Sequence, residues 1–386
     1  MPDSAATLAT YVIDLLRFGA ASSTYKHAVL LGLMDLSLEK DVAFGSETAQ
    51  LVTTRELALK VIDLYWNQTR PTRLRSQGVR LAGEGPRVLV QNPQGPADRR
   101  QRGGGIVADI GELRRAVRDL EGHRPQDALR VGLARDHQRL VEKVEWTLVT
   151  MPLPKLEGGL RERKIYEIGW DDDTSAPKRA AFKAYLEGNR STFDNGIRLK
   201  PAAAACFRSL HGMLRPYIQL HWAMKVATFN KLEVETLHEE LFGCERDSLA
   251  PVRTPLVELQ GGRCFYCANP IGGTPEVDHF VPWSMQNNDC IYNLVATDRR
   301  CNHAKRDTFA AAEHVERWLA RYRELAGPLE QIAAEKRWLT KPIPTKESAH
   351  VLYGALREDA PLWKGVARAE PNHRERIARA FESVRV

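Results

Sequence analysis

The chain has 386 residues, of which 43% are hydrophobic and 27% are charged. These values are typical of a globular protein with two or three domains, and they exclude a disordered, collagen-like or coiled-coil chain. No apolar run approaches the roughly 18 residues that a membrane span requires. The opening residues Met1-Pro2-Asp3-Ser4 lack the basic-then-apolar pattern of a secretion signal. We therefore expect a cytoplasmic protein with no membrane contact.

The first part of the chain is predicted to be helical. Apolar residues recur at helical spacing over residues 11–16 and 25–38. A third helix is expected to begin at Thr53, because Glu56 three residues later completes the pattern of a capping box. We assign residues 1–82 to an N-terminal helical domain.

A segment rich in glycine, proline and arginine follows, and we predict a linker over residues 83–105. Eight arginines and only two acidic residues lie between Arg70 and Gly105, in a chain whose net charge is +7. Such a segment would be exposed and contact phosphates through Arg99, Arg100 and Arg102, or it would be a solvated linker with no ligand. The sequence leaves both interpretations open.

Helical patterns resume after this segment. Helices are expected over residues 110–121, 126–150, 201–220 and 222–241, and the alternation within 164–170 favours a strand. We group residues 106–260 as a central, mostly helical region. After the motif region described next, an amphipathic helix opens a C-terminal helical region, residues 311–386.

The residues that indicate chemistry lie between positions 261 and 310. Four elements follow one another in order: Cys264-Phe265-Tyr266-Cys267, then Val277-Asp278-His279, then Asn293, then Cys301-Asn302-His303-Ala304-Lys305. At these residues the sequence resembles the HNH nucleases, the ββα-metal or His-Me finger group. The spacing from Asp278 to Asn302 also resembles the HNH domain of the RNA-guided CRISPR nucleases. The resemblance covers about an eighth of the chain and implies a small ββα-metal nuclease domain at residues 261–310.

The residue types fit that chemistry. Asp278 and Asn302 offer oxygen ligands, which Mg²⁺ and Mn²⁺ prefer. His279 follows Asp278 in a strand and so points to the other side, where it is free to act as a general base on water. The resemblance assigns the same roles and adds Asn293, which would hold the backbone or ring of His279 in place. Lys305 or Arg306 is expected to meet phosphate oxygens.

A second, structural metal site is predicted from the cysteines. Four of the six cysteines lie between positions 264 and 301. The spacing of Cys264 and Cys267 suits tetrahedral Zn²⁺, with Cys301 as a third ligand. The resemblance places a further cysteine where this chain has Asp298, which is a candidate for the fourth ligand. Cys290 is a rival for that place, and a redox role for the Cys264 and Cys267 pair is the other interpretation.

The sequence therefore predicts a mainly α (α+β) protein in which helical regions surround a small ββα-metal domain. The resemblance implies metal-dependent hydrolysis of DNA phosphodiester bonds, and by analogy a role in bacterial genome defence or restriction. The helical regions would select the substrate, a protein partner or a second copy of the chain. The alternatives are a zinc-stabilised nucleic-acid-binding module without cleavage, and a subunit whose nuclease acts only within a larger complex.

Overall fold

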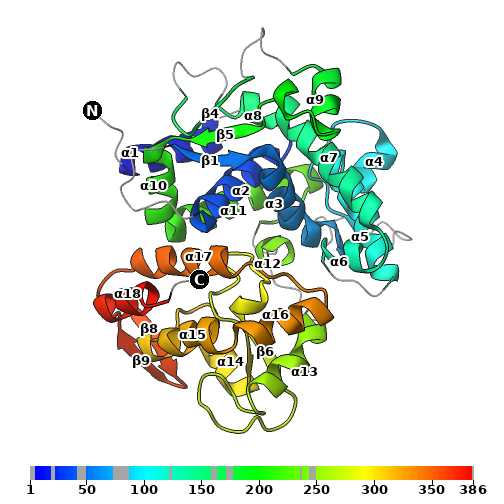
Figure 1. Ribbon diagram of the computed structural model, residues 1–386. Coiled ribbons are helices and arrows are strands. Elements are labelled where there is room, and N and C mark those ends of the chain that lie inside the picture. The colour runs from blue at the N-terminus through cyan, green and yellow to red at the C-terminus, as the bar shows by residue number, and fades with distance from the viewer. Residues whose placement is uncertain are drawn as a thin grey trace. The chain divides into compact units, whose positions relative to one another are not determined.

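The computed structural model describes residues 5–18, 22–40, 49–72, 87–120, 124–157, 163–170, 177–234, 237–242 and 249–384. The chain divides into two compact units. Unit 1 comprises Met1–Ser37 and Val42–Gly243, and unit 2 comprises Leu38–Asp41 and Cys244–Val386. Helices predominate in both, with small sheets (Figure 1). Within the described residues, no helix is long and apolar enough to cross a membrane.

Unit 1 is a set of helices around a three-stranded antiparallel sheet of order β1-β5-β4. A second pair of short strands, β2 and β3, lies outside this sheet. Its described elements are α1 (Ala5–Phe18), α2 (Tyr25–Glu39), β1 (Gln50–Thr53), α3 (Thr54–Trp66), β2 (Pro71–Thr72), β3 (Arg87–Val88), α4 (Ala97–Gln101), α5 (Gly105–Asp119), α6 (Asp127–Arg130), α7 (Ala134–Thr150), α8 (Pro152–Lys155), β4 (Tyr166–Ile168), α9 (Arg179–Leu186), β5 (Gly196–Leu199), α10 (Pro201–Ser209), α11 (His211–Asn230) and α12 (Leu237–Phe242).

Local signals placed several of these elements correctly. The predicted capping box is present, because the Thr53 hydroxyl accepts from the Glu56 amide and the Glu56 carboxylate accepts from the Thr53 amide. The predicted strand at 164–170 is β4. Helix boundaries differ from expectation further along. The expected helix 126–150 is divided into α6 and α7, because Gly132 adopts a left-handed φ of 84° between them.

The two long helices expected over 201–220 and 222–241 are also different. The structure instead has α10, α11 and α12, with breaks at Leu210 and after Asn230. Lys231 ends α11 in the left-handed conformation, with φ 55°. Apolar periodicity runs across such a break, because it reports which face is buried and not where the backbone turns.

The glycine run at residues 103–105 is an ordered, tightly packed turn. A Cβ atom on Gly104 would lie 1.8 Å from the Asn92 carbonyl oxygen, and one on Gly105 would lie 1.9 Å from the Tyr25 hydroxyl. That hydroxyl accepts from the Ile106 amide at 3.0 Å, at the start of α5. Within the described part of the expected linker, residues 94–98 are exposed, whereas the glycine run is packed against its neighbours in unit 1. Glycine is required there because any side chain would collide with the neighbouring backbone and ring.

Unit 2 carries the motif region on a two-stranded antiparallel hairpin. Its described elements are α13 (Ala250–Leu259), β6 (Glu276–His279), β7 (Leu294–Thr297), α14 (Arg299–Lys305), α15 (Ala312–Glu324), α16 (Ala326–Glu335), α17 (Pro342–Gly354), β8 (Pro361–Gly365), β9 (Arg368–Pro371) and α18 (Arg374–Glu382). The expected C-terminal helical region also contains the β8–β9 hairpin, which periodicity did not indicate.

The β6–β7 hairpin is held in place by the core of unit 2. Strand β7 is buried along its whole length, and the rings of Phe280 and Trp318 are stacked 4.7 Å apart. The Gln260 side chain at the end of α13 bonds both the amide and the carbonyl of Ala296 in β7, at 2.9 and 2.8 Å. A hairpin too small to be stable alone is thus held by the helices around it.

Candidate active site and metal centre

The Cys264 and Cys267 pair lies in a tight turn between Arg263 and Pro270, which form an antiparallel bridge. The amide of Cys264 donates to Asn269 O, and the amide of Ala268 donates to Cys264 O, both at 2.9 Å. Ala268 has a left-handed φ of 61°. The turn brings the two cysteines, which are three positions apart in the sequence, to the same end of unit 2.

Asp298 and Cys301 complete a four-residue cluster at the start of α14. Oδ1 of Asp298 caps the helix by accepting from the Cys301 amide at 2.8 Å. Its Oδ2 lies 3.2 Å from the Sγ of Cys267. One ligand atom from each of Cys264, Cys267, Asp298 and Cys301 lies within 4.8 Å of the others. The four residues proposed from the sequence as zinc ligands therefore meet.

The donor set suits a metal ion such as zinc. Three thiols and one carboxylate oxygen are ligands that Zn²⁺ accepts, and four such donors suit the tetrahedral coordination of a structural zinc site. Cys290, the rival ligand, lies outside the cluster. It is buried, and its Sγ accepts from the Lys341 amide at 3.1 Å.

Protonation in this cluster depends on its own hydrogen bonds. Burial would raise the pKa of Asp298, but hydrogen bonds from Cys264, Cys267 and the Cys301 amide outweigh it and lower that pKa to about 2. Burial and the neighbouring thiols raise the pKa values of Cys301 and Cys267. The carboxylate is thus ready to bind a cation, whereas these two thiols must lose protons when one binds.

The β6–β7 hairpin presents the second group of polar residues. Asp278 is opposite Val295, and His279 is opposite Leu294. Because side chains alternate along a strand, Glu276 and Asp278 share one face, and His279 points to the other. Helix α14 packs against β6. Two groups from the helix meet Glu276 and Asp278 on this face.

Asp278 is held through one of its two oxygens. The Tyr266 hydroxyl donates to Oδ2 at 2.6 Å, and Lys305 Nζ lies 3.0 Å from the same atom. Burial and the Asp278 charge raise the pKa of Tyr266, so that the hydroxyl remains a donor. Among the described residues, Oδ1 of Asp278 has no hydrogen-bond partner. The carboxylate is thus fixed in orientation with one oxygen still available.

Asn302 is oriented in the same way. Its Nδ2 donates to Oε2 of Glu276 at 2.6 Å. An amide that donates through its nitrogen to a carboxylate directs its carbonyl oxygen elsewhere. Glu276 therefore does not occupy Asn302 Oδ1, the oxygen that would serve as a metal ligand.

His279 lies on the other face of the strand end and is 6% exposed. Its Nε2 is 2.8 Å from Oδ1 of Asp289, and its ring centroid is 5.0 Å from that of Trp283. Its Nδ1 has no hydrogen-bond partner in the part of the chain that the structure describes. One ring nitrogen is held by Asp289, and the other is not engaged by any described residue.

Asn293 closes the loop that follows His279. It is fully buried, and its Oδ1 accepts from the Val281 amide at 2.9 Å. Its Nδ2 donates to Val281 O at 3.2 Å and to Asn288 O at 3.0 Å. The sequence suggested that Asn293 holds the backbone or ring of His279. The structure places its side chain on the backbone two residues beyond His279.

Comparison with known proteins bears on this region. Residues 264–311 match the family model described as HNH endonuclease. We refer to this matching segment as the HNH domain. Searches of curated proteins and of solved structures found no match to the chain.

The two basic residues at the end of α14 in the HNH domain have different surroundings. Lys305 is fully buried, and its Nζ contacts Asp278 and the carbonyl oxygen of His279 at 3.1 Å. It therefore lies behind the site and not at its surface, in contrast to the phosphate contact expected from the sequence. Arg306 is exposed and has a left-handed φ of 50° where the helix ends.

The arginines proposed outside the HNH domain are partly engaged with acidic side chains. Arg99 pairs with Asp109 at 2.7 Å, and Arg102 pairs with Asp98 and Glu112. Arg100 is exposed. Residues 73–86 of the arginine-rich stretch lie outside the described residues. Arg99 and Arg102 therefore form ion pairs within unit 1.

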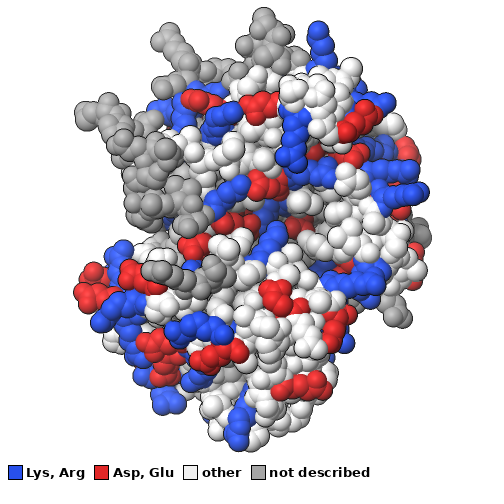
Figure 2. Space-filling model, in the orientation of Figure 1, with Lys and Arg blue, Asp and Glu red and all other residues white. Residues whose placement is uncertain are grey.

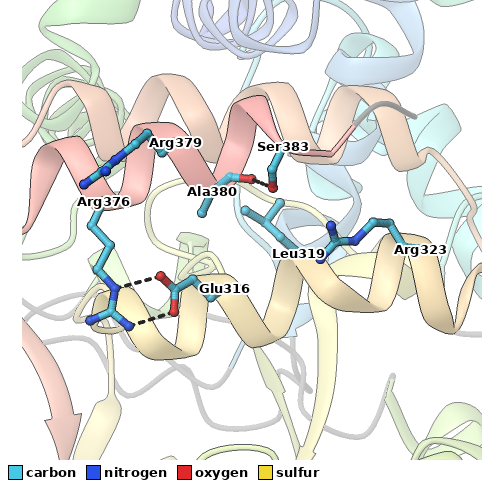
Figure 3. A pocket seen from close by; sticks show the side chains of 7 residues that line it. All are labelled: Glu316, Leu319, Arg323, Arg376, Arg379, Ala380 and Ser383. Carbon is cyan, nitrogen blue, oxygen red and sulfur yellow. Dashed lines mark hydrogen bonds and ion pairs between the residues drawn. The ribbon is translucent and has the colours of Figure 1, made fainter.

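A groove of 420 Å³ lies between α15 and α18, two helices that follow the HNH domain in the sequence. Figure 3 shows Arg376 of α18 bridging to Glu316 of α15 through two bonds, both 2.7 Å. Arg323 and Arg379 also line the groove. On the face shown in Figure 2, basic and acidic side chains are interspersed. The net positive charge is thus not gathered into one patch on that face.

Three residues around the site were not singled out from the sequence. Glu276 could have been found, because strand alternation places it on the face of Asp278. Tyr266 lies inside the Cys-x-x-Cys turn, where an aromatic residue is first interpreted as packing. Asp289 lies in an irregular loop, and no periodic signal points from it to His279.

Proposed function

We propose that the HNH domain hydrolyses phosphodiester bonds of nucleic acid, with DNA as the substrate, and requires Mg²⁺ or Mn²⁺. The observation that supports this proposal is the arrangement of three side chains. Asp278, Asn302 and His279 are each held through one polar atom, while a second polar atom capable of the chemistry is left unengaged. A binding module without catalysis would have no need of this preorganisation.

The side chains divide the work in the proposed reaction. His279 accepts the proton of the attacking water through Nδ1. Asp278 Oδ1 and Asn302 Oδ1 would hold the divalent cation, which supplies Lewis-acid stabilisation of the phosphate and the leaving oxygen. Lys305 partly neutralises Asp278 from behind, and Glu276 keeps the Asn302 amide in one orientation.

Other residues would support the substrate and the fold. Arg306, exposed beyond α14, and Arg100 in unit 1 are the basic residues best placed among those proposed to contact phosphates without reading bases. Each lost contact should flatten the dependence of log affinity on log salt by about 0.9 for duplex DNA. The cluster of Cys264, Cys267, Asp298 and Cys301 would bind a structural zinc ion.

The decisive experiment compares wild type with His279→Ala on plasmid, linear and single-stranded DNA and on RNA, with Mg²⁺, Mn²⁺ or EDTA. We expect His279→Ala to lower cleavage by about 10²–10⁴-fold, the scale of a general base, and to leave binding unchanged. His373→Ala, at an exposed histidine of the same unit, is the matched control. Wild-type cutting by His279→Ala would refute the mechanism.

The same assay separates the alternatives. Binding without cleavage under all metal conditions would favour a zinc-stabilised binding module. Cleavage that appears only when cell extract is added, and that His279→Ala abolishes, would favour a subunit active in a larger complex. A role in bacterial genome defence or restriction predicts that cells carrying the wild type, but not His279→Ala, resist phage.

A further inference from the structure

The loop between β6 and β7 holds Asp289 in a fixed position opposite His279. On one side, Asn293 Nδ2 bonds Asn288 O, and the Asn288 side chain accepts from the Cys290 amide at 2.9 Å. At Asp289 itself, the backbone carbonyl accepts from Trp338 Nε1 at 2.7 Å. The residues before and after Asp289 and its own carbonyl are thus bonded, so that its side chain has a defined place.

The contact between Asp289 and His279 determines the state of the imidazole. An ionised carboxylate only accepts hydrogen bonds, so the 2.8 Å contact requires the proton to be on Nε2. A neutral imidazole then carries its lone pair on Nδ1. The side chains of His279 and Asp289 are 8% and 15% exposed, so water competes weakly for this hydrogen bond. Trp283 packs against the ring and limits its rotation.

We propose that Asp289 is the positioning residue for His279, selecting the tautomer with a free Nδ1 and stabilising the imidazolium that forms during the reaction. The inference rests on the proposed function. In the step concerned, a water O–H bond breaks and its proton moves to Nδ1. The oxygen electron pair forms the new P–O bond, and the P–O bond to the leaving group breaks. The leaving oxygen takes a proton from solvent, and the imidazolium returns its proton to solvent.

The hydrogen bond between Asp289 and His279 meets one requirement of each side chain. A carboxylate with little exposure is costly unless it meets a donor, and His279 Nε2 is that donor. The imidazole also needs a partner to fix its tautomer, as histidines with a chemical role usually have. Asp289 satisfies both requirements with one hydrogen bond.

The test uses Asp289→Asn and Asp289→Ala in the full chain, with Asp359→Asn, at an exposed aspartate of the same unit, as the control. Asparagine keeps the shape but replaces one acceptor oxygen with a donor, so both imidazole tautomers become allowed. We expect kcat to fall by about 10–100-fold with KM unchanged, the scale for partners that orient a histidine. In the His279→Ala background, Asp289→Asn should cause no further loss, because both act through one group.

A second readout does not depend on cleavage. Nitrogen-15 NMR of the His279 ring, in protein that keeps its zinc but lacks Mg²⁺ and Mn²⁺, should show the Nε2–H tautomer in wild type and a mixture in Asp289→Ala. A wild-type tautomer in that variant, or wild-type kcat in both Asp289 variants, would overturn the inference. If His279→Ala itself cuts normally, the proposed function fails instead, so the two failures are distinguishable. If Asp289→Ala does not fold, the spectrum of Asp289→Asn decides.

Discussion

At the scale of single residues, each side chain with a proposed chemical role is held by at least one neighbouring side chain. Tyr266 and Lys305 hold Asp278, Glu276 holds Asn302, and Asp289 holds His279. The partner residues come from the turn that holds Cys264 and Cys267, from α14, from β6 and from the loop between β6 and β7. The chemistry therefore depends on how these elements are packed as much as on the motif residues.

Tyr266→Phe tests the support of Asp278. The substitution removes a hydrogen bond to a charged, mostly buried carboxylate, and such bonds contribute about 1.5–3 kcal/mol. We expect the free energy of unfolding of unit 2 to fall by that amount in urea titrations, with reduced cleavage. Tyr322→Phe, whose buried hydroxyl has no hydrogen-bond partner among the described residues, should cost clearly less. Equal losses in the two variants would contradict the assigned role.

Cys264→Ser tests the metal cluster. Elemental analysis should find about one zinc per wild-type chain, and the variant should lose zinc and melt at a lower temperature. Cys290→Ser is the control and should keep its zinc. Because the pKa values of Cys267 and Cys301 are raised, zinc should bind more weakly as pH falls, with protons released on binding. Wild type that folds normally without zinc would remove the structural site.

At the scale of elements, helices α15 and α18 are joined across the groove of Figure 3 by the Glu316–Arg376 pair. The hydrogen bond from Arg376 lowers the pKa of Glu316. A lowered carboxyl pKa stabilises the fold above the unfolded value of 4.5, and this contribution is lost as pH falls through the folded value.

Glu316→Gln should therefore destabilise unit 2 slightly at neutral pH and have no effect once the carboxyl is protonated. Both side chains are more than two-fifths exposed, so solvent and salt screen the pair, and the loss should stay below about 1 kcal/mol. Thermal melts at pH 7 in low and high salt measure it. A loss that does not shrink in high salt would show that packing, and not charge, is responsible.

At the scale of the whole molecule, the two units have separate hydrophobic cores, so the stability of each depends on pH through its own buried groups. His27 in the core of unit 1 illustrates this. Its burial, helped by the Lys26 charge, lowers the pKa of the imidazole to about 3. The unfolded chain then binds more protons than the folded chain between pH 6.5 and about 3, so the stability of unit 1 falls as pH drops through that range.

His27→Gln should reduce this acid sensitivity. One proton taken up on unfolding changes stability by about 1.4 kcal/mol per pH unit, so the wild type should lose stability below pH 6.5 with a steeper slope than the variant. Chemical unfolding at several pH values measures both slopes. His373→Gln, at an exposed histidine, should keep the wild-type slope, and an equal slope in His27→Gln would contradict the assignment.

The sequence alone determined what depends on near neighbours in the chain. It predicted the mainly helical class, the capping box at Thr53, the HNH domain and the cluster of four potential metal ligands, because caps and metal motifs require fixed residue types at short spacing. Tertiary structure decided what depends on packing between distant segments. Lys305 was proposed with Arg306 to meet phosphate oxygens, but it is buried, because α14 turns that face toward β6. Asp289 meets His279 only because Asn293 closes the intervening loop, and no periodic pattern encodes such a contact.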